Sequence, residues 1–272
     1  KNALTLICSH KSIARVITIP RFIRARELKK VECYDGIFFF TNFAEYFSIM
    51  EKKHIVNKFD KKLISSLPRV IFEGKIIIVL TEDVAEKAVE YLLTQSILGI
   101  DTETRPCFTK GKHYKVALLQ VATYDTCFLF RLNHLGDSPA IKRLLEDITI
   151  PKIGLSLHDD INSLSKRITF KKGWFIDLQD IMKDLGIEDM SLAKLYANIF
   201  GKRISKREQL SNWEADILND KQKKYAATDA WVCINLFEEY MRLKESGEYE
   251  LEIIDKCTTE SNTTTDKLEN IT

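Results

Sequence analysis

The spacing of apolar residues changes several times along the chain, and each change predicts a new element. Continuous or alternating apolar stretches predict strands at 76–80, 97–103, 116–123, 126–132 and 152–156. Apolar residues at helical spacing predict helices at 82–94, 139–146, 158–167, 178–185, 191–200 and 214–241. Two of the strands would form a hairpin around Tyr124 and Asp125. Such a sheet, followed by alternating strands and helices, indicates an α/β fold with a mixed sheet flanked by helices.

The two ends of the chain lack this regularity. Residues 1–54 mix basic and apolar side chains without a sustained period. They could form a basic nucleic-acid-binding arm or an extension outside the fold, and we favour the extension. Residues 251–272 are polar and predict a disordered tail, which leaves 55–250 as one folded domain. A protein that starts at Met50, the first methionine, should therefore match the full chain in stability and activity.

Composition and charge narrow the class of protein without deciding it. The 272 residues are 45% hydrophobic and 29% charged, which is enough for a full core in a globular domain. A formal net charge of +2 is too small for a histone-like binder, so contact with a polyanion must come from local basic patches. The longest apolar runs are far shorter than the roughly 20 residues of a membrane span. The scattered cysteines indicate reduced thiols in a cytoplasmic protein.

Acidic residues at the end of one predicted strand give the first candidate chemistry. Asp101 and Glu103 are separated by one residue, so on a strand both side chains leave the same face. Two carboxylates this close repel each other unless a cation lies between them, and their oxygen atoms favour Mg²⁺ or Mn²⁺. Taken alone, such a pair is more often two solvated acids at the end of a strand.

Two further motifs place acids in the second half of the chain. Residues 154–160 run from a short apolar strand into a helix and end in Asp159 and Asp160, which could both be simple helix-capping residues. Tyr225 and Asp229 are four residues apart on a predicted helix and therefore share a face, as many such pairs do. None of these motifs is specific by itself.

Together, the order and spacing of the three motifs resemble those of the DEDDy 3′-to-5′ exonucleases, the family of ribonuclease D and the Werner-syndrome helicase exonuclease domain. The resemblance covers about residues 98–243, with further agreement at 117–120 and 208–213. The family pattern has an apolar residue four positions after the second acid, and Leu164 therefore selects Asp160 over Asp159. A sister class has histidine five positions before the last acid. This chain has Lys224 there and Tyr225 at four, which indicates the tyrosine class.

The resemblance implies an RNase H-like fold, a single nuclease domain and two divalent ions, Mg²⁺ or Mn²⁺, acting on a DNA or RNA 3′ end. Asp101 would bridge both ions, Glu103 and Asp229 would complete one site, and Asp160 would hold the other largely through water. Tyr225 would orient the attacking water. The alternative is a catalytically weak nucleic-acid-binding module on the same fold, which predicts a missing acid, and none is missing.

Contacts to nucleic acid are expected mainly at phosphates, which favour cationic side chains. The candidate contacts are Thr102, Gln120, Lys202, Arg203, Lys206, Arg207 and Lys224. The basic loop at 202–207, which holds Lys202, Arg203, Lys206 and Arg207, could equally be an ordinary solvated charge run. A second basic patch at 110–115 follows Phe108, which could stack on a terminal base or pack into the fold.

Overall fold

The computed structural model describes residues 52–111 and 113–254, together with the backbone of four short strands nearer the N-terminus. Contacts between residues divide the chain into two compact units, Lys1–Glu51 and Lys52–Thr272. In the first unit, two antiparallel pairs form, β1 (Thr5–His10) with β2 (Ile13–Thr18) and β3 (Cys33–Tyr34) with β4 (Ile37–Phe38). The apolar pattern does not predict these strands, because residues 1–54 mix basic and apolar side chains without a sustained period. Most of the tail predicted at 251–272 lies outside the described residues.

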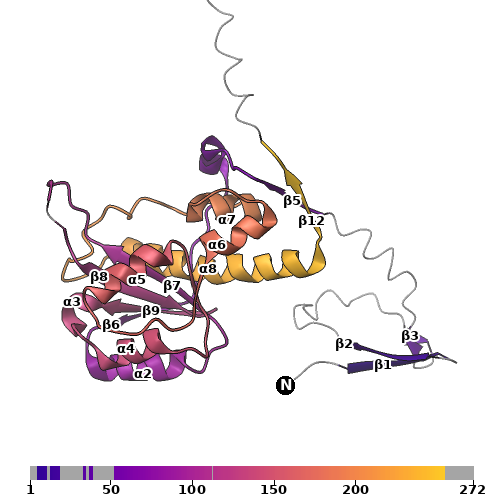
Figure 1. Ribbon diagram of the computed structural model, residues 1–272, viewed down its shortest axis with the longest axis horizontal. Helices are drawn as coiled ribbons and strands as arrows, with labels where there is room; N and C mark the ends of the chain where they lie inside the picture. The colour runs from indigo at the N-terminus through magenta and orange to yellow at the C-terminus, as the bar shows by residue number, and fades with distance from the viewer. Residues whose placement is uncertain are drawn as a thin grey trace, which may run out of the picture. The chain divides into compact units, whose positions relative to one another are not determined.

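A six-stranded mixed sheet forms the centre of the second unit, in the order β11-β10-β7-β8-β9-β6 (Figure 1). Its strands are β6 (Lys75–Val79), β7 (Leu98–Thr104), β8 (Val116–Ala122), β9 (Thr126–Arg131), β10 (Lys152–Gly154) and β11 (Phe175–Asp177). β7, β8 and β9 run antiparallel to one another, whereas β6, β10 and β11 each pair in parallel. The predicted mixed sheet and its hairpin are confirmed.

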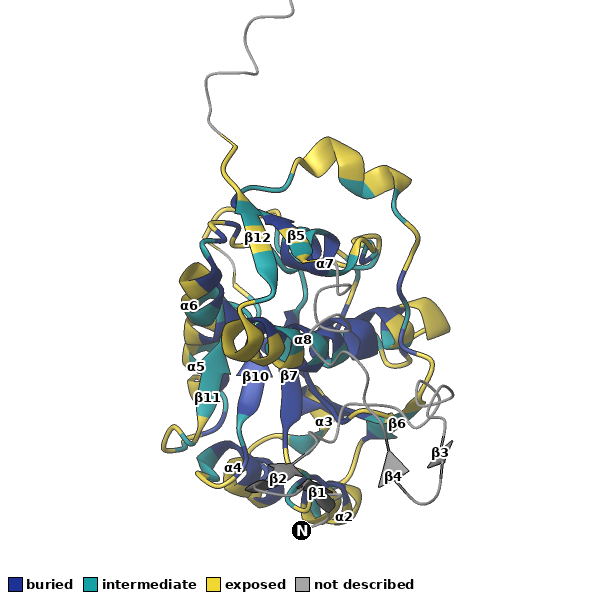
Figure 2. Ribbon diagram, turned by 90° about the vertical axis from the view of Figure 1, so that its right-hand side faces the viewer, coloured by how far each residue is buried: buried dark blue, intermediate teal, exposed yellow. Residues whose placement is uncertain are grey.

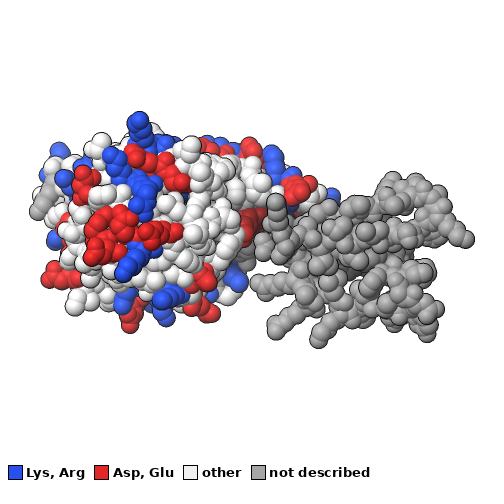
Figure 3. Space-filling model, turned by 90° about the horizontal axis from the view of Figure 1, so that it is seen from below, with Lys and Arg blue, Asp and Glu red and all other residues white. Residues whose placement is uncertain are grey.

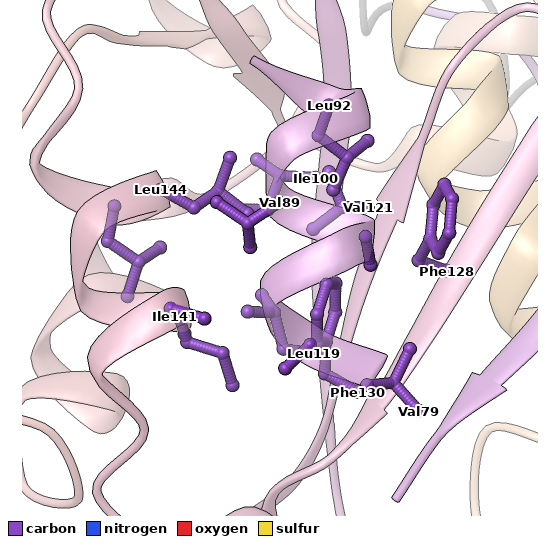
Figure 4. Close-up of a cluster of buried hydrophobic side chains, with 14 of the residues drawn as sticks. Val79, Val89, Leu92, Ile100, Leu119, Val121, Phe128, Phe130, Ile141 and Leu144 are labelled. Carbon is purple, nitrogen blue, oxygen red and sulfur yellow. The ribbon is translucent and has the colours of Figure 1, made fainter. Parts of the chain in front are cut away.

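Helices cover both faces of this sheet (Figure 1). α8 (Asp220–Ser246) crosses one face, where its alanines pack against apolar side chains of β8 and β9. The other face is covered by α2 (Glu82–Leu92), α3 (Leu132–Leu135), α4 (Pro139–Glu146) and α5 (Leu157–Ser165). Figure 4 shows Val89 and Ile141 of these helices meeting Leu119 of the sheet. Each such buried aliphatic side chain contributes about 1.5–3 kcal/mol.

A further group of elements surrounds the C-terminal half of α8 (Figure 2). It consists of β5 (Lys53–Val56), α6 (Leu178–Ile181), the 3₁₀ helix η2 (Met182–Leu185), α7 (Leu192–Phe200) and β12 (Tyr249–Glu252). The 3₁₀ helix η1 (Lys61–Ser66) buries none of its residues and contacts α7. β5 pairs in parallel with β12. The Asn198 side chain joins α7 to β5, because it accepts from the Val56 amide at 3.0 Å and donates to the Val56 carbonyl at 2.7 Å.

The largest error in a predicted boundary is at the long helix, which starts at Asp220 and not at 214. Asn219 and Gln222 form a capping box, in which each side chain accepts from the other residue's backbone amide. The helix extends to Ser246 and ends at Gly247, whose φ of 66° suits glycine.

Two smaller predictions can be compared with the described part of the chain. Cys107, Cys127 and Cys233 are free thiols there. None of the helices in that part is long and apolar enough to cross a membrane.

Candidate active site

Strand β7 brings the first two predicted acids together. Asp101 and Glu103 lie on the face of the sheet that α8 covers, and Glu103 is 9% exposed. Asp101 pairs directly with Gln120 of β8, and the register shifts by a bulge after Glu103. Bulges at a strand end commonly redirect a side chain beside an active site. The C-terminal end of β7, a central strand, therefore presents both carboxylates toward the helix.

Helix α8 brings the third acid to the same place. A Cβ at Gly99 would lie 2.0 Å from the Ala230 carbonyl oxygen, so only glycine lets α8 approach β7 this closely. Asp229, next to Ala230, is 7% exposed. Carboxylate oxygens of Asp101, Glu103 and Asp229 all lie within 4.8 Å of one another. These three predicted ligands therefore converge.

Asp160 joins the group from the first turn of α5. Its Oδ1 accepts a hydrogen bond of 2.5 Å from the Thr102 hydroxyl, which comes from the strand between the first two acids. The turn before α5 is unusual, because Ser156 has a φ of 58°. Asp177 stabilises it by accepting from the backbone amides of Ser156 at 3.0 Å and Leu157 at 2.7 Å. Asp177 is not among the predicted site residues, although an acid at the end of an apolar Phe-Ile segment is a visible signal.

Burial and mutual repulsion make charged carboxylates costly at this site. Burial, followed by the charges of Asp160 and Glu103, raises the pKa of Asp101 well above its usual range. Burial raises the pKa of Glu103 to about 9, that of Asp229 to about 7 and that of Asp160 to about 6. For Asp160, the hydrogen bond from Thr102 opposes the rise. The cluster has no cation among its members and would be stabilised by one.

The donor set fits a divalent ion. Among the described residues, Asp229 Oδ1 is buried and has no hydrogen-bond partner, so a ligand-accepting oxygen is available within the cluster. All the donors are carboxylates, which suits Mg²⁺ or Mn²⁺ better than a soft metal. Asp101, Glu103 and Asp229 could hold such an ion directly, with Asp160 beside them.

Tyr225 lies one turn before Asp229 on α8 and is 7% exposed. Burial and the nearby charges of Asp229 and Glu103 raise its pKa far above the usual range, so its hydroxyl stays protonated at neutral pH. Its ring packs against Trp213, with ring centroids 5.9 Å apart. Trp213 is fully buried. In the sequence it belongs to the segment 208–213 and was not predicted as a site residue. A protonated phenol at this position can donate a hydrogen bond.

Ionic contacts connect the segments that flank this tyrosine. Arg131 of β9 donates to the carbonyls of Ala215 and Asp216, which lie just before α8. Arg105, two residues after Glu103, forms an ion pair with Glu214 at 3.3 Å. The segment before α8 is therefore held from both β9 and the loop after β7.

The predicted nucleic-acid contacts do not form one surface. Gln120 is 0% exposed beneath α8, which removes its side chain from any surface available to a strand. The hydroxyl of Thr102 is occupied by Asp160, and Arg203 Nε donates to the Leu67 carbonyl at 2.8 Å. The remaining candidates are exposed, namely Lys202, Lys206, Arg207 and Lys224. In the second patch Phe108 is 85% exposed, and position 112 lies outside the described residues.

The mixed sheet with an acid cluster under its crossing helix defines an RNase H-like exonuclease domain. A model of the 3′-5′ exonuclease family matches residues 76–244, more than half of the chain, and the chain therefore belongs to the DEDDy 3′-5′ exonuclease family.

Curated relatives match only with part of their length. The mouse bifunctional 3′-5′ exonuclease/ATP-dependent helicase WRN is 28% identical over 212 residues, which cover 73% of this chain and 15% of that protein. The exonuclease 3′-5′ domain-containing protein 2 of Drosophila melanogaster is 31% identical over 166 residues, covering 60% of this chain and 28% of that protein. This chain therefore spans less than a third of either relative.

Solved structures share the fold at low identity. The exonuclease domain of Aedes aegypti Nibbler superposes with a TM-score of 0.57 at 21% identity, covering 65% of this chain and 92% of that one. Escherichia coli RNase D gives a TM-score of 0.55 at 21% identity, covering 63% and 46%. These matches confirm the predicted RNase H-like exonuclease fold.

Proposed function

We propose that this chain hydrolyses the terminal phosphodiester bond at the 3′ end of a single-stranded DNA or RNA and releases nucleoside monophosphates. The observation that carries the proposal is the convergence of Asp101, Glu103 and Asp229 within 4.8 Å, with a buried Asp229 oxygen that lacks a partner. Family membership supports an exonuclease reaction. A ribonuclease D of Trypanosoma brucei with the same fold has been solved in complex with RNA U12, which supports a nucleic-acid substrate.

The ligands in the proposed site would be Asp101, Glu103, Asp229 and Asp160, holding two Mg²⁺ or Mn²⁺ ions. Such ions, when bound, lower the pKa of water and stabilise charge on the attacking and leaving oxygens. Thr102 fixes the orientation of Asp160 through its hydroxyl. Tyr225 stays protonated and donates a hydrogen bond that orients the attacking water or the scissile phosphate. Trp213 holds the tyrosine ring in place.

A direct assay tests this proposal. The purified protein is incubated with labelled single-stranded DNA, single-stranded RNA and recessed duplexes, with Mg²⁺ or Mn²⁺ or with excess chelator. We expect stepwise loss of mononucleotides from a free 3′ end, only when metal is present. Asp101→Asn should reduce the rate by several orders of magnitude, because it removes a charge at the centre of the cluster.

A matched control is available one residue from the second motif acid. Asp159 is exposed and adjacent to Asp160, so Asp159→Asn removes one carboxylate nearby without touching the proposed ligands. This variant should keep most of the activity. Full activity in excess chelator would refute the metal requirement, and a tenth of the rate in Asp101→Asn would refute the assignment of the site. An inactive protein that still binds nucleic acid would favour the binding-module alternative.

A further inference from the structure

A cavity of about 430 Å³ lies apart from the carboxylate cluster, between η1, the start of α7 and the basic loop. Its lining includes Lys61 and Ser65 of η1, Lys194 of α7, and the segment 203–207. η1 lies before residue 76 and therefore outside the segment that matches the exonuclease family. The cavity thus combines a family segment with one that the family match does not include.

The walls of this cavity are held together by backbone contacts. The Val70 amide donates to the Arg203 carbonyl at 3.0 Å, and the Arg203 amide donates to the Pro68 carbonyl at 2.9 Å. Arg203 Nε also donates to the Leu67 carbonyl, which directly follows η1. These three bonds fix the basic loop against the end of η1. Hydrogen bonds therefore hold two walls of the cavity in a fixed arrangement.

The lining of the cavity combines apolar residues with cationic ones. It carries five basic residues and no Asp or Glu: Lys61, Lys194, Arg203, Lys206 and Arg207. Lys194 is partly neutralised by Asp189 at 2.8 Å. Among the described residues, no ion pair engages Lys61, Lys206 or Arg207, and all three are exposed. Such a cluster of unpaired positive charge in a concave site favours an anion.

The segment 206–213 leads from this cavity to the acid cluster. The Lys206 carbonyl accepts from the Gln209 amide at 3.3 Å, and the Gln209 carbonyl accepts from Nε1 of Trp213, whose ring packs against Tyr225. A chain of phosphates with its 3′ end at the carboxylates could therefore continue past Lys206 into the cavity.

We propose that this cavity binds backbone phosphates of the substrate strand upstream of its 3′-terminal nucleotide, through Lys61 of η1 and Arg207 of the basic loop. The proposal rests on the proposed exonuclease function and extends it with an anchoring site. Phosphate contacts carry no base information, so the anchor should hold DNA and RNA strands of any sequence. It would keep a shortened strand bound between successive cleavages.

The test compares charge reversals inside and outside the cavity. Lys61→Glu/Arg207→Glu is compared with Lys87→Glu/Lys142→Glu, which changes the net charge equally. Lys87 and Lys142 are exposed on α2 and α4, on the opposite face of the sheet. Figure 3 shows the molecule from the side of these helices, where basic and acidic side chains are mixed. The control therefore lies outside any cationic cavity.

Binding is measured by fluorescence anisotropy with 5′-labelled oligonucleotides of two to ten nucleotides, in chelator so that no strand is cleaved, over a range of salt concentrations. We expect the cavity variant to bind the longer strands about 10- to 100-fold more weakly than the wild type. The slope of log affinity against log salt should flatten by about 1.4, since each phosphate contact contributes roughly 0.7 on single strands. The shortest strands, which do not reach the cavity, should bind equally, and the control variant should bind as the wild type does.

Two outcomes would overturn the proposal: equal binding by the cavity and control variants, or an equal loss at every strand length. Preferential competition by polyglutamate over oligonucleotide would assign the cavity to an acidic protein segment instead. If the reversed charges prevent folding, Lys61→Gln/Arg207→Gln provides the same comparison with a smaller effect. Hydrolysis is measured separately, so unchanged binding of long strands by the cavity variant, together with normal cleavage by the wild type, rejects the anchor alone. Absence of cleavage in the wild type rejects the proposed function, while the binding comparison stays valid.

Discussion

Replacing Asp229 by Asn should stabilise the metal-free protein. The raised pKa of Asp229, about 7 against a usual 3.8, corresponds to about 4 kcal/mol at about 1.4 kcal/mol per pKa unit. Because the pKa is raised in the folded state, this cost is absent below about pH 4 and complete above about pH 7. An amide avoids the cost but is itself a buried polar group, so we expect a net gain of about 2 kcal/mol at pH 8. That gain raises Tm by about 4–8 °C.

Added metal should reverse this order of stability. The wild type should gain about 2.7 kcal/mol at a metal concentration of 100 times Kd, whereas Asp229→Asn should gain far less. Thermal unfolding is measured for both proteins at pH 5 and pH 8, with chelator and with Mn²⁺. Glu90→Gln on α2, an exposed site on the opposite face, removes one negative charge as a control and should shift Tm little. Two results together would refute the reasoning: metal-free Asp229→Asn melts below the wild type at pH 8, and Mn²⁺ stabilises both proteins equally. Buried carboxylate charge would then not destabilise the metal-free site.

Three further perturbations test separate parts of the structure. Tyr225→Phe should lower kcat by about 100-fold with little change in substrate affinity, since a held hydroxyl acts through orientation; an affinity loss without a kcat loss would make it a binding residue. Lys152 is 0% exposed, and burial lowers its pKa to about 8. Between pH 8 and 10 the free energy of unfolding of the wild type should therefore rise by up to about 3 kcal/mol relative to that of Lys152→Met. Denaturant unfolding that gives both proteins the same dependence on pH would contradict this. A protein that starts at Met50 should match the full chain in Tm and specific activity, and a midpoint several degrees lower would show that the first 49 residues belong to the folded enzyme.

Apolar periodicity was sufficient for the elements that bury a whole face. The strand near 76–80 and the helix near 139–146 follow directly from it, and the structure places both within a residue or two. The spacing of Asp101 and Glu103 predicted a shared face because a strand has a period of two. Their proximity to Asp229 required the family resemblance, since no local pattern says where a helix will cross a sheet.

Elements that depend on distant partners were not predictable in this way. β5 and β12 are four residues long and pair across almost the whole domain. β11 has three residues and is stabilised by its parallel neighbour β10. The start of α8 could have been found, because Asn219 and Gln222 stand at capping-box spacing. The burial of Gln120 could also have been found, because it lies within the continuous apolar run of β8, which is typical of a strand covered on both faces.

The close approach of α8 to β7 makes Gly99 an unusual position for protein engineering. Glycine inside a strand costs roughly 0.5–1 kcal/mol relative to alanine, so a search for stabilising substitutions would choose this site early. The missing methyl group, however, determines how far Asp229 stands from the strand that carries Asp101. Thermostabilised libraries of this domain should therefore leave Gly99 fixed, because a helix displaced by one methyl group would still fold and would separate the carboxylates.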